Sequence, residues 1–286
     1  IIELGENYGF AEGYNRAIEQ VESKYVVLLN SDVEVTPNWL DTLLNYARTH
    51  EEVAAIQPKI LSWQSKEDAL KSGSTEILFE HAGAAGGLID VLGYPYCRGR
   101  FMSHVEYDHG QYDDIVPIFW ASGACLFINR EIYQKSGGLD AHFFAHQEEI
   151  DLCWRLNSQG YTIVVLPQSV IYHLGGGALG YESPRKTFLN FRNNLLMLYK
   201  NLPASKLPWI LLIRFFLDYI AAIQMLLTGK RLNASAVIKA RCEFFKLRRV
   251  YKDKRANIIR NAKTTSTIPI SQRSIIFDYY VCGKRK

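Results

Sequence analysis

The hydrophobic positions of the chain predict strands and helices that alternate from its start. Apolar runs at Tyr25–Leu29 and 53–57 are typical of strands buried on both faces. Apolar residues three and four positions apart predict helices at about 10–22 and 37–49, and the second helix opens at Thr36-Pro37, an N-cap followed by proline. Because strands alternate with helices, we expect an α/β fold with a mostly parallel sheet flanked by helices.

The pattern weakens after this first part. Residues 62–115 show no clear periodicity and are rich in Gly, Tyr and charged residues, so we expect a loop-rich excursion near a functional site. The later elements that the pattern predicts are a strand at 118–128, helices at 130–136, 147–159 and 185–201, and strands at 162–166 and 169–172.

The last third of the chain changes character. Residues 207–227 are apolar except at Arg214, Asp218 and Gln224, and a helix of this length would span a bilayer. Arg214 and Asp218 lie four residues apart on one helix face, and charges at mid-span are costly. We therefore expect this helix to lie in the membrane interface or to pack on the rest of the protein.

A strongly basic segment follows, with a helix expected at about 234–255. Residues 205–286 hold 18 Lys or Arg against 4 Asp or Glu, whereas residues 1–204 hold 15 against 25. This split predicts a body at 1–204 and a basic, amphipathic helical tail at 205–286 that meets an anionic membrane surface. A solvated charged helix is the alternative. Nothing in the chain resembles a nucleic-acid-binding module, so we expect no nucleic-acid partner.

The composition indicates the class of protein and its cellular compartment. Apolar residues make up 48% and aromatic residues 13% of the chain, which are values of a globular protein. The five cysteines are widely spaced, odd in number and without a C-x-x-C pair, which argues for a reducing compartment and against a structural zinc site. Together with the tail, this predicts a cytoplasmic protein, peripheral on the inner face of the cell membrane.

Polar residues follow the first strand directly. Asn30-Ser31-Asp32 lies just beyond its carboxyl end, where ligands of open α/β sheets bind. A carboxylate there suits a cation held against a diphosphate, because Mg²⁺ usually takes one or two carboxylates together with substrate phosphates. The same pattern is also a common strand-to-turn junction, and that alternative stays open.

Further motifs surround this turn. Upstream, Asn7, Gly9 and Asn15 lie in a Gly-containing segment that lets the backbone approach a ligand. The downstream motifs are Trp120-Ala-Ser-Gly-Ala-Cys-Leu-Phe-Ile-Asn129, Gly137-Gly-Leu-Asp-Ala-His-Phe-Phe144, and Glu148-Glu-Ile-Asp-Leu-Cys-Trp-Arg155. In order and composition they resemble the inverting glycosyltransferases of family 2, in particular rhamnosyltransferase-like members with the GT-A fold. The resemblance covers roughly residues 1–201.

The resemblance implies a site for a nucleotide-sugar donor, a dTDP- or UDP-sugar, and a Mg²⁺ or Mn²⁺ cofactor. Asp32 is the expected metal ligand and His173, in Ile171-Tyr-His-Leu-Gly-Gly-Gly177, the second ligand or a phosphate donor. Asn30 stands where the family often has the first Asp of an Asp-x-Asp motif. The donor-binding residues that we expect are Asn7, Gly9, Asn15, Asn30, Asp32 and Arg192, with Asn193 beside Arg192.

For the chemistry, the resemblance implies a carboxylate base. Glu149 occupies the position of that base in Glu148-Glu149-Ile150-Asp151, with Glu in place of the usual Asp. Glu148 is the alternative base, and Asp151 with Arg155 is expected to form an i,i+4 pair. Clustered carboxylates also raise one another's pKa, which favours proton acceptance.

Trp120, Ser122 and Gly123 resemble the acceptor-contact segment of the family. A Trp face suits a sugar ring, although a core Trp is the alternative.

The start of the chain departs from the family. Ile1-Ile2-Glu3-Leu4 looks like a strand already inside the domain, so roughly 50 residues that build the nucleotide pocket are expected to be missing. The function expected is transfer of a hexosyl or deoxyhexosyl group to a lipid-linked saccharide or polysaccharide in cell-envelope glycan synthesis. The alternatives are a truncated, non-catalytic remnant that binds membrane or a partner protein, and a metal-dependent hydrolase built on Asp32 and His173.

Overall fold

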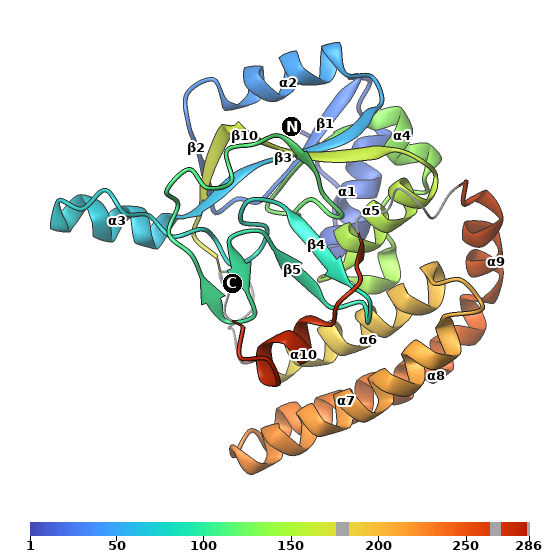
Figure 1. Cartoon of the computed structure of the whole chain (residues 1–286). Coiled ribbons are helices and arrows are strands. Elements are labelled where there is room, and N and C mark those ends of the chain that lie inside the picture. The colour runs from blue at the N-terminus through green and yellow to red at the C-terminus, as the bar shows by residue number, and fades with distance from the viewer. Residues whose placement is uncertain (176–182, 264–269, 285–286) are drawn as a thin grey trace.

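The computed structural model describes residues 1–175, 183–263 and 270–284. Its centre is a sheet with the strand order β1-β9-β3-β10-β2, and β8 pairs with β10 outside this path (Figure 1). The strands are β1 (Tyr25–Leu29), β2 (Val33–Val35), β3 (Val53–Ser62), β8 (Val116–Pro117), β9 (Cys125–Asn129) and β10 (Thr162–His173).

The sheet is mixed, so the prediction of a mostly parallel sheet is wrong. β3 and β10 are parallel, but β9 lies between β1 and β3 and is antiparallel to both. β2 and β8 are antiparallel to β10. The reason lies in the long excursion after β3, because the chain returns from it at the carboxyl ends of β1 and β3 and enters β9 from that edge. The α/β class and the flanking helices are confirmed.

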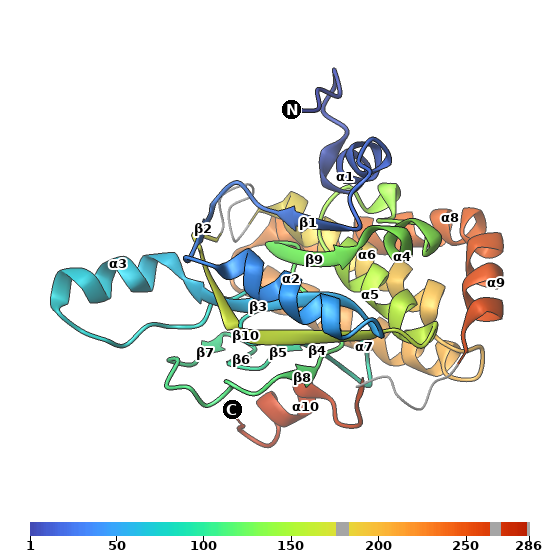
Figure 2. The same cartoon turned by 90° about the horizontal axis from the view of Figure 1, so that it is seen from above.

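Helices cover both faces of the sheet (Figures 1 and 2). On one face, α2 (Trp39–Thr49) packs Leu43 and Ala47 against Ile56 of β3 and Phe127 of β9. On the other face lies the larger core, to which α1 (Gly9–Glu19), α5 (Glu148–Ser158) and α6 (Pro184–Asn201) contribute buried residues. The short α4 (Arg130–Lys135) follows β9 and leads, through the 3₁₀ turn η1 (Ala141–Phe143), to α5.

The excursion is more ordered than predicted. It holds α3 (Trp63–Ser72) and, among the described residues, a second sheet in the order β11-β4-β5-β6-β7. These strands are β4 (Gly87–Asp90), β5 (Pro95–Cys97), β6 (Arg100–Phe101), β7 (His104–Val105) and β11 (Ile270–Ser271). Strands of two to four residues are too short to leave a periodic signal, and β11 comes from the far end of the chain.

Several predicted boundaries differ. Only 125–128 of the expected strand 118–128 lies in a strand, β9, and β8 ends at Pro117 before the predicted start. The predicted strands 162–166 and 169–172 form the single strand β10, with a register shift between Leu166 and Val170. The second helix begins at Trp39 and not at Thr36-Pro37. The Thr36 hydroxyl donates to the Val170 carbonyl and so ties the chain to β10 instead of capping a helix.

The C-terminal segment consists of α7 (Leu207–Leu227), α8 (Arg231–Val250), α9 (Lys252–Asn261) and α10 (Ile275–Tyr280). The helix predicted at 234–255 is therefore two helices, and they join at Tyr251. Tyr251 is buried and its hydroxyl donates to Asp140, so the side chain anchors the joint to the body. α8 packs along α6, and β11 extends the second sheet, so this segment is built into the fold.

Candidate active site

The carboxyl ends of β1 and β10 bring the predicted metal residues together. His173, the last residue of β10, lies opposite Val33 in the pairing with β2. The backbone N–H of Leu174 donates to the Asp32 carbonyl (3.1 Å), and that of Asn30 donates to Ala124, just before β9 (3.1 Å). Three segments far apart in the sequence, 30–33, 122–124 and 173–174, thus meet at one edge of the sheet.

The side chains of Asp32 and His173 face one another at this edge. His173 Nε2 lies 3.3 Å from Asp32 Oδ1 and 3.4 Å from Asn30 Nδ2. On the other side of the ring, Nδ1 lies 3.6 Å from Oε2 of the buried Glu80. A shallow hollow of about 230 Å³ adjoins this group and is lined by Asp32, Val33, Glu34, Trp63 and Leu174.

These residues fit a divalent cation whose remaining ligands come from a substrate. A carboxylate and an imidazole nitrogen converge, and a second carboxylate lies on the far side of the imidazole, as in the carboxylate–histidine–metal arrangements of known sites. Within the described ranges no group of three or more His, Cys, Asp or Glu forms a metal site. The chain would therefore supply Asp32 and His173, and a diphosphate would supply further oxygens.

The carboxylates of Glu80 and Asp32 affect the pKa of His173. Burial by itself lowers the pKa of His173, but Glu80 and Asp32 raise it by more, so that the pKa lies above its ordinary value. The imidazole thus sits in a negative environment that suits a proton or a metal cation.

Glu80 was missed by the sequence analysis. It lies in the irregular excursion, and its backbone N–H donates to the Ile60 carbonyl beside the end of β3. An isolated Glu in a segment without periodicity carries no signal, so only the fold reveals that it faces His173.

The two predicted base residues open α5 (Glu148–Ser158). Glu148 is buried, whereas Glu149 is partly exposed, with its Oε2 buried and without a hydrogen-bond partner in the described structure. A Cβ placed on Gly123 would lie 3.9 Å from the Glu149 carboxyl carbon and 3.2 Å from the ring of Phe10. Glu149 therefore lies against the 122–124 segment that also contacts Asn30.

Burial gives the Glu148 and Glu149 carboxyls higher pKa values than those of ordinary glutamates. It raises the pKa of Glu149 to about 7, against the opposing effect of backbone N–H groups that include Gly123. Burial and the neighbouring Glu149 raise the pKa of Glu148 well above its ordinary value. Burial thus favours the neutral form of both carboxyls, and with a pKa of about 7 Glu149 is close to half ionised at neutral pH and can accept a proton.

The loop before this pair has an unusual backbone. Phe144, His146 and Gln147 all have positive φ values, of 63°, 70° and 73°, which non-glycine residues rarely adopt. Asn193 of α6, fully buried, donates its side-chain amide to the carbonyls of Phe143 (3.0 Å), Ala145 (2.9 Å) and His146 (2.8 Å). This single amide fixes the strained segment that delivers Glu148 and Glu149.

Arg192 is next to Asn193 and contacts the same loop. Its Nη2 donates to the carbonyls of His142 (2.9 Å) and Phe143 (3.3 Å). We expected Arg192 to reach the donor diphosphate, but the structure engages its guanidinium with backbone carbonyls instead.

Asn15 also differs from the expectation of a donor contact. Its Nδ2 donates to the Leu139 carbonyl (2.8 Å), and its Oδ1 accepts from the Tyr133 hydroxyl (2.6 Å) and the Leu139 N–H (3.0 Å). Because both ends of the amide are engaged, Asn15 joins α1 to the segment before η1.

Trp120 and Ser122 lie deeper than expected for acceptor contacts. Trp120 is 4% exposed, its ring covers Gly87, and its Nε1 donates to the Leu88 carbonyl (2.8 Å). The Ser122 hydroxyl donates to the Ala82 carbonyl (2.8 Å). Both act as supports for the segment, and of the three predicted acceptor residues only Gly123 lies against Glu149.

The remaining predicted donor residues lie at the start of α1. The Asn7 side chain accepts from the Gly9 N–H (3.0 Å), and Gly9 has a φ of 76°. A Cβ at Gly9 would meet the Phe144 ring at 2.8 Å, so this glycine is needed for close packing on the strained loop. The predicted glycine loop at Gly175–Gly177 lies outside the described residues from 176 onward.

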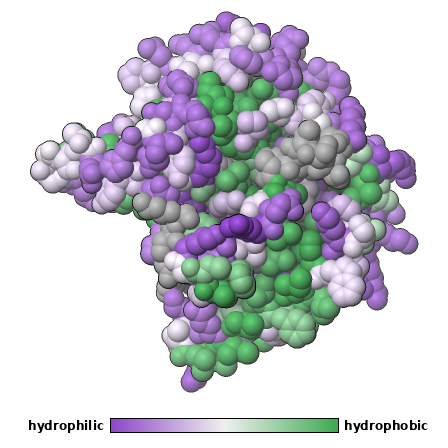
Figure 3. All heavy atoms as spheres, viewed as in Figure 1, coloured by the Kyte–Doolittle hydropathy of each residue, from purple (hydrophilic) through white to green (hydrophobic). Residues whose placement is uncertain are grey.

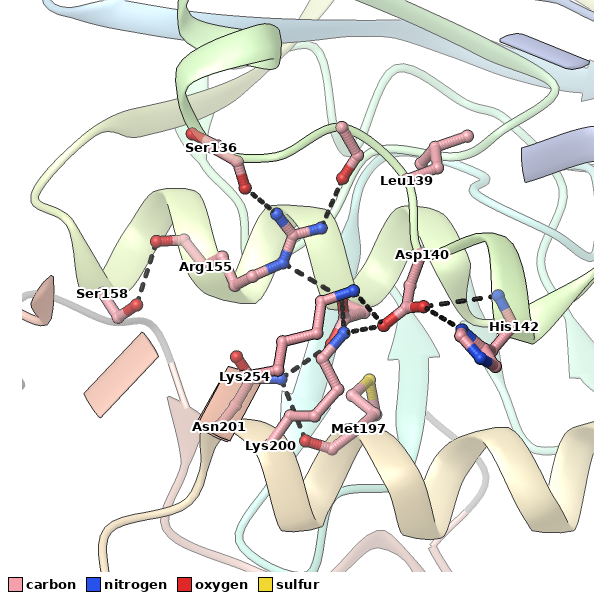
Figure 4. A network of polar contacts seen from close by, with 12 residues as sticks. Ser136, Leu139, Asp140, His142, Arg155, Ser158, Met197, Lys200, Asn201 and Lys254 are labelled. Carbon is pink, nitrogen blue, oxygen red and sulfur yellow. Dashed lines mark hydrogen bonds and ion pairs between the residues drawn. The ribbon is translucent and has the colours of Figure 1, made fainter. Parts of the chain in front are cut away.

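A buried ionic network connects α5 to α6 and to Asp140 (Figure 4). Lys200 donates to Asp140 (2.6 Å) and Asp151 (2.7 Å), and Arg155 pairs with Asp151 (3.1 Å) as predicted. Lys254 of α9 also reaches Asp140 (2.9 Å). Asp140 before η1, α5, α6 and α9 thus share one network.

The chain is similar to several known proteins. Residues 2–195 match the protein family described as Glycosyltransferase like family 2. An N-acetylglucosaminyl-diphospho-decaprenol L-rhamnosyltransferase of Mycobacterium tuberculosis is 24% identical over 184 residues, which are 60% of this chain and 58% of that protein. An O-antigen biosynthesis protein of Myxococcus xanthus is 29% identical over 168 residues, 56% of this chain and 12% of that protein.

A low-salt glycan biosynthesis hexosyltransferase of Haloferax volcanii is 24% identical over 206 residues, 68% of this chain and 58% of that protein. The chain therefore spans little more than half the length of two of these relatives and a small part of the third.

Among solved structures, GalNAc-T7 with UDP, GalNAc and Mn²⁺ gives a TM-score of 0.49 at 15% identity, over 70% of this chain and 36% of that one. A Pyrobaculum calidifontis mannosyltransferase with GDP-Man and Mn²⁺ gives 0.42 at 16% identity, over 91% and 67%. Both scores are below 0.5, so we draw no residue roles from these structures.

Proposed function

Because the chain belongs to the glycosyltransferase-like family 2, we propose that it transfers a hexosyl or deoxyhexosyl group from a nucleotide-diphosphate donor with inversion at the anomeric carbon. One observation carries this proposal. Glu149, with a pKa of about 7, lies against Gly123, in the segment whose neighbour Ala124 is hydrogen-bonded to Asn30 at the edge that holds Asp32 and His173. A proton acceptor and two residues that would hold a cation against a diphosphate thus share one edge.

The donor end of the site is built on Asp32 and His173. These two side chains would hold Mg²⁺ or Mn²⁺, which would neutralise charge on the leaving nucleoside diphosphate. Glu80 lies 3.6 Å from Nδ1 of the imidazole, and Asn30 lies beside Nε2. Asn7 and Gly9, at the start of α1, are the further donor contacts that we propose.

The acceptor end is built on Glu149. The acceptor hydroxyl oxygen attacks the anomeric carbon, the bond from that carbon to the diphosphate oxygen breaks, and the hydroxyl proton passes to the Glu149 carboxylate. A single in-line displacement inverts the anomeric centre. Burial and the neighbouring Glu149 favour the protonated form of Glu148, which limits the negative charge beside the base.

For the acceptor we propose a lipid-linked saccharide in cell-surface glycan synthesis. The Mycobacterium tuberculosis relative is named for transfer of L-rhamnose to N-acetylglucosaminyl-diphospho-decaprenol. As the donor we propose a dTDP- or UDP-sugar.

We also propose that the protein works at the inner face of the cell membrane. α7 (Leu207–Leu227) is the one helix in the described ranges that is long and apolar enough to cross a bilayer. The segment 205–286 carries 18 Lys or Arg against 4 Asp or Glu, which favours an anionic surface.

Turnover of matched variants tests the base. With a decaprenyl- or shorter prenyl-diphosphate-linked N-acetylglucosamine as acceptor, Glu149→Gln should lower kcat/KM about 10²- to 10⁴-fold. Glu148→Gln is the control, because Gln resembles the protonated acid, and it should change kcat/KM much less. Full turnover by Glu149→Gln would contradict the assignment, and the reverse pattern would give the base role to Glu148.

A further inference from the structure

α7 presents its apolar residues to the outside and its charged residues to the inside. Its buried positions are Ile210, Arg214, Asp218 and Ala222, four residues apart along one face. The large apolar side chains on the other faces are exposed, among them Trp209 at 68%, Phe216 at 59% and Ile220 at 61%. Figure 3 shows hydrophobic atoms gathered over the lower part of the molecule, where Figure 1 draws α7 and α10.

Arg214 and Asp218 fasten this helix to the body. Arg214 donates to the Leu92 carbonyl (3.2 Å), to Asn194 of α6 and to Asp218 (3.3 Å), and its guanidinium lies 4.0 Å from the centre of the Tyr94 ring. Because Arg214 is bonded to Asp218 and to the body of the protein, α7 is held along the surface with its apolar face exposed, as an interfacial helix is.

A groove runs between α7 and α10 on this exposed face. It has a volume of about 760 Å³, within the range of pockets that bind small ligands. Its apolar lining includes Leu92, Ile213, Leu217, Ile276, Phe277 and Val281. Ile213 and Phe277 are themselves 44% and 55% exposed, so the groove opens onto the apolar face.

The lining also carries charge. Arg273 and Lys284 line the groove together with Asp278, and Lys284 pairs with Asp278 (3.1 Å). Arg273 forms no ion pair within the described residues, so the lining has a net positive charge beside its apolar side chains. That combination suits a hydrocarbon chain with a phosphate at its end.

The groove also lies close in structure to the loop before the catalytic pair. Leu92 lines the groove, and the carbonyl of the next residue, Gly93, accepts from Asn194 Nδ2 (2.9 Å). The same Asn194 amide donates to Gln147 Oε1 (3.2 Å), one residue before Glu148. One buried amide thus connects the wall of the groove with the start of α5.

From these observations we propose that the groove between α7 and α10 binds the prenyl chain of the lipid-linked acceptor. The proposal rests on the proposed function, since it names where the acceptor's lipid portion binds. A bilayer in contact with the apolar face would present such chains directly to the groove opening.

Direct binding tests the groove without requiring turnover. Farnesyl diphosphate, used below its critical micelle concentration, provides the chain and the phosphates, and inorganic diphosphate provides the phosphates alone. We expect farnesyl diphosphate to bind the whole chain at least about tenfold more tightly, because an apolar pocket discriminates by this factor for even one missing carbon unit. Equal affinity for the two probes would overturn the proposal.

Two matched variants separate the groove from the rest of the apolar face. Ile213→Asp changes a residue that lines the groove, and Ile220→Asp makes the same change on the same helix outside the groove lining. Ile213→Asp should weaken farnesyl diphosphate binding about tenfold or more, whereas Ile220→Asp should leave it within about twofold. Equal loss in both variants would show adsorption to the apolar face and would overturn the groove assignment.

Two further results distinguish this proposal from its premise. Metal-dependent UDP or dTDP binding that persists while farnesyl diphosphate fails to bind would refute the groove alone. A dimer that Ile213→Asp dissolves, seen by sedimentation, would assign the groove to a second copy of the chain and would also refute it.

Discussion

Glu149 is the side chain to which the proposed function assigns proton transfer. Burial favours its neutral form and raises its pKa from an ordinary 4.5 to about 7. A base with such a pKa is half ionised near neutral pH, where the strength of the base and the fraction of ionised enzyme are both useful.

The raised pKa also has a cost in stability, which Glu149→Gln should remove. The folded protein favours protonated Glu149, so stability is lost as pH rises from about 4.5 through about 7. We expect Glu149→Gln to increase the free energy of unfolding by about 2 kcal/mol at pH 8 and to change it little at pH 4. Urea unfolding at the two pH values measures this, and equal stability of variant and parent at pH 8 would show that the carboxyl is not buried as described.

Glu80 is a second residue of interest, because it lies beside the predicted metal ligand His173. It lies 3.6 Å from His173 Nδ1, on the side of the ring opposite Asp32. Carboxylates in this relation to a metal-binding histidine typically affect metal affinity 10- to 100-fold.

We therefore expect Glu80→Gln to weaken Mn²⁺ binding in the presence of UDP or dTDP by about tenfold, while the far-UV circular dichroism stays the same. Glu76→Gln, in the same segment and exposed, is the matched control. Unchanged Mn²⁺ affinity in Glu80→Gln would separate this carboxylate from the metal site.

At the scale of elements, α6 determines the shape of the loop that delivers the base. Its Asn193 satisfies three carbonyls of a segment in which three non-glycine residues have positive φ. Such conformations cost about 1–3 kcal/mol each and persist only where their surroundings fix them.

Asn193→Ala should therefore lower kcat about 100-fold, since small displacements of a catalytic group have effects of that size, while the donor KM changes little. Asn190→Ala, on the same helix and not buried, is the control. A loss confined to donor KM would instead support the direct diphosphate contact that the sequence suggested for this helix.

The elements that the sequence predicted well are those with long periodic or apolar patterns. β1 and α7 have the predicted ends, and α1, α5 and α6 begin or end within a few residues of them. The antiparallel insertion of β9 between β1 and β3 left no local signal, because strand order depends on the path of the chain through the excursion. The short strands of the second sheet failed for a similar reason, since β11 pairs with a strand far away in sequence.

The candidate site also contains residues that the sequence predicted correctly to lie together and residues whose surroundings it did not predict. Asp32, His173 and Glu149 follow recognisable motifs, and the structure brings the first two within 3.3 Å. Asn15 and Trp120 stand in the same motifs, yet their polar groups are engaged inside the protein. A motif identifies residues that a family needs, but it does not separate those that would touch a substrate from those that support them.

At the scale of the whole molecule, the exposed apolar face of α7 is connected to the segment that carries Glu148 and Glu149. Arg214 of α7 donates to Asn194, which also contacts Gln147 beside Glu148. The apolar face and the active site are therefore joined through two layers of side chains.

We expect this face to bind vesicles that contain phosphatidylglycerol. Leu212→Glu, on α7, should weaken binding severalfold in co-sedimentation, because it places a charge in the apolar face. Leu70→Glu, an exposed leucine on α3, is the control and should bind as the parent does. Equal binding by all three proteins would exclude α7 as the membrane contact.

The most direct test of the central claim is calorimetric titration of this chain with UDP and with dTDP, each with and without Mn²⁺. We predict that one nucleotide binds, that Mn²⁺ strengthens the binding, and that Asp32→Asn abolishes the metal effect while the protein stays folded. Failure of both nucleotides to bind to the folded chain, with or without Mn²⁺, would contradict a donor site at Asp32 and His173 and favour a non-catalytic role.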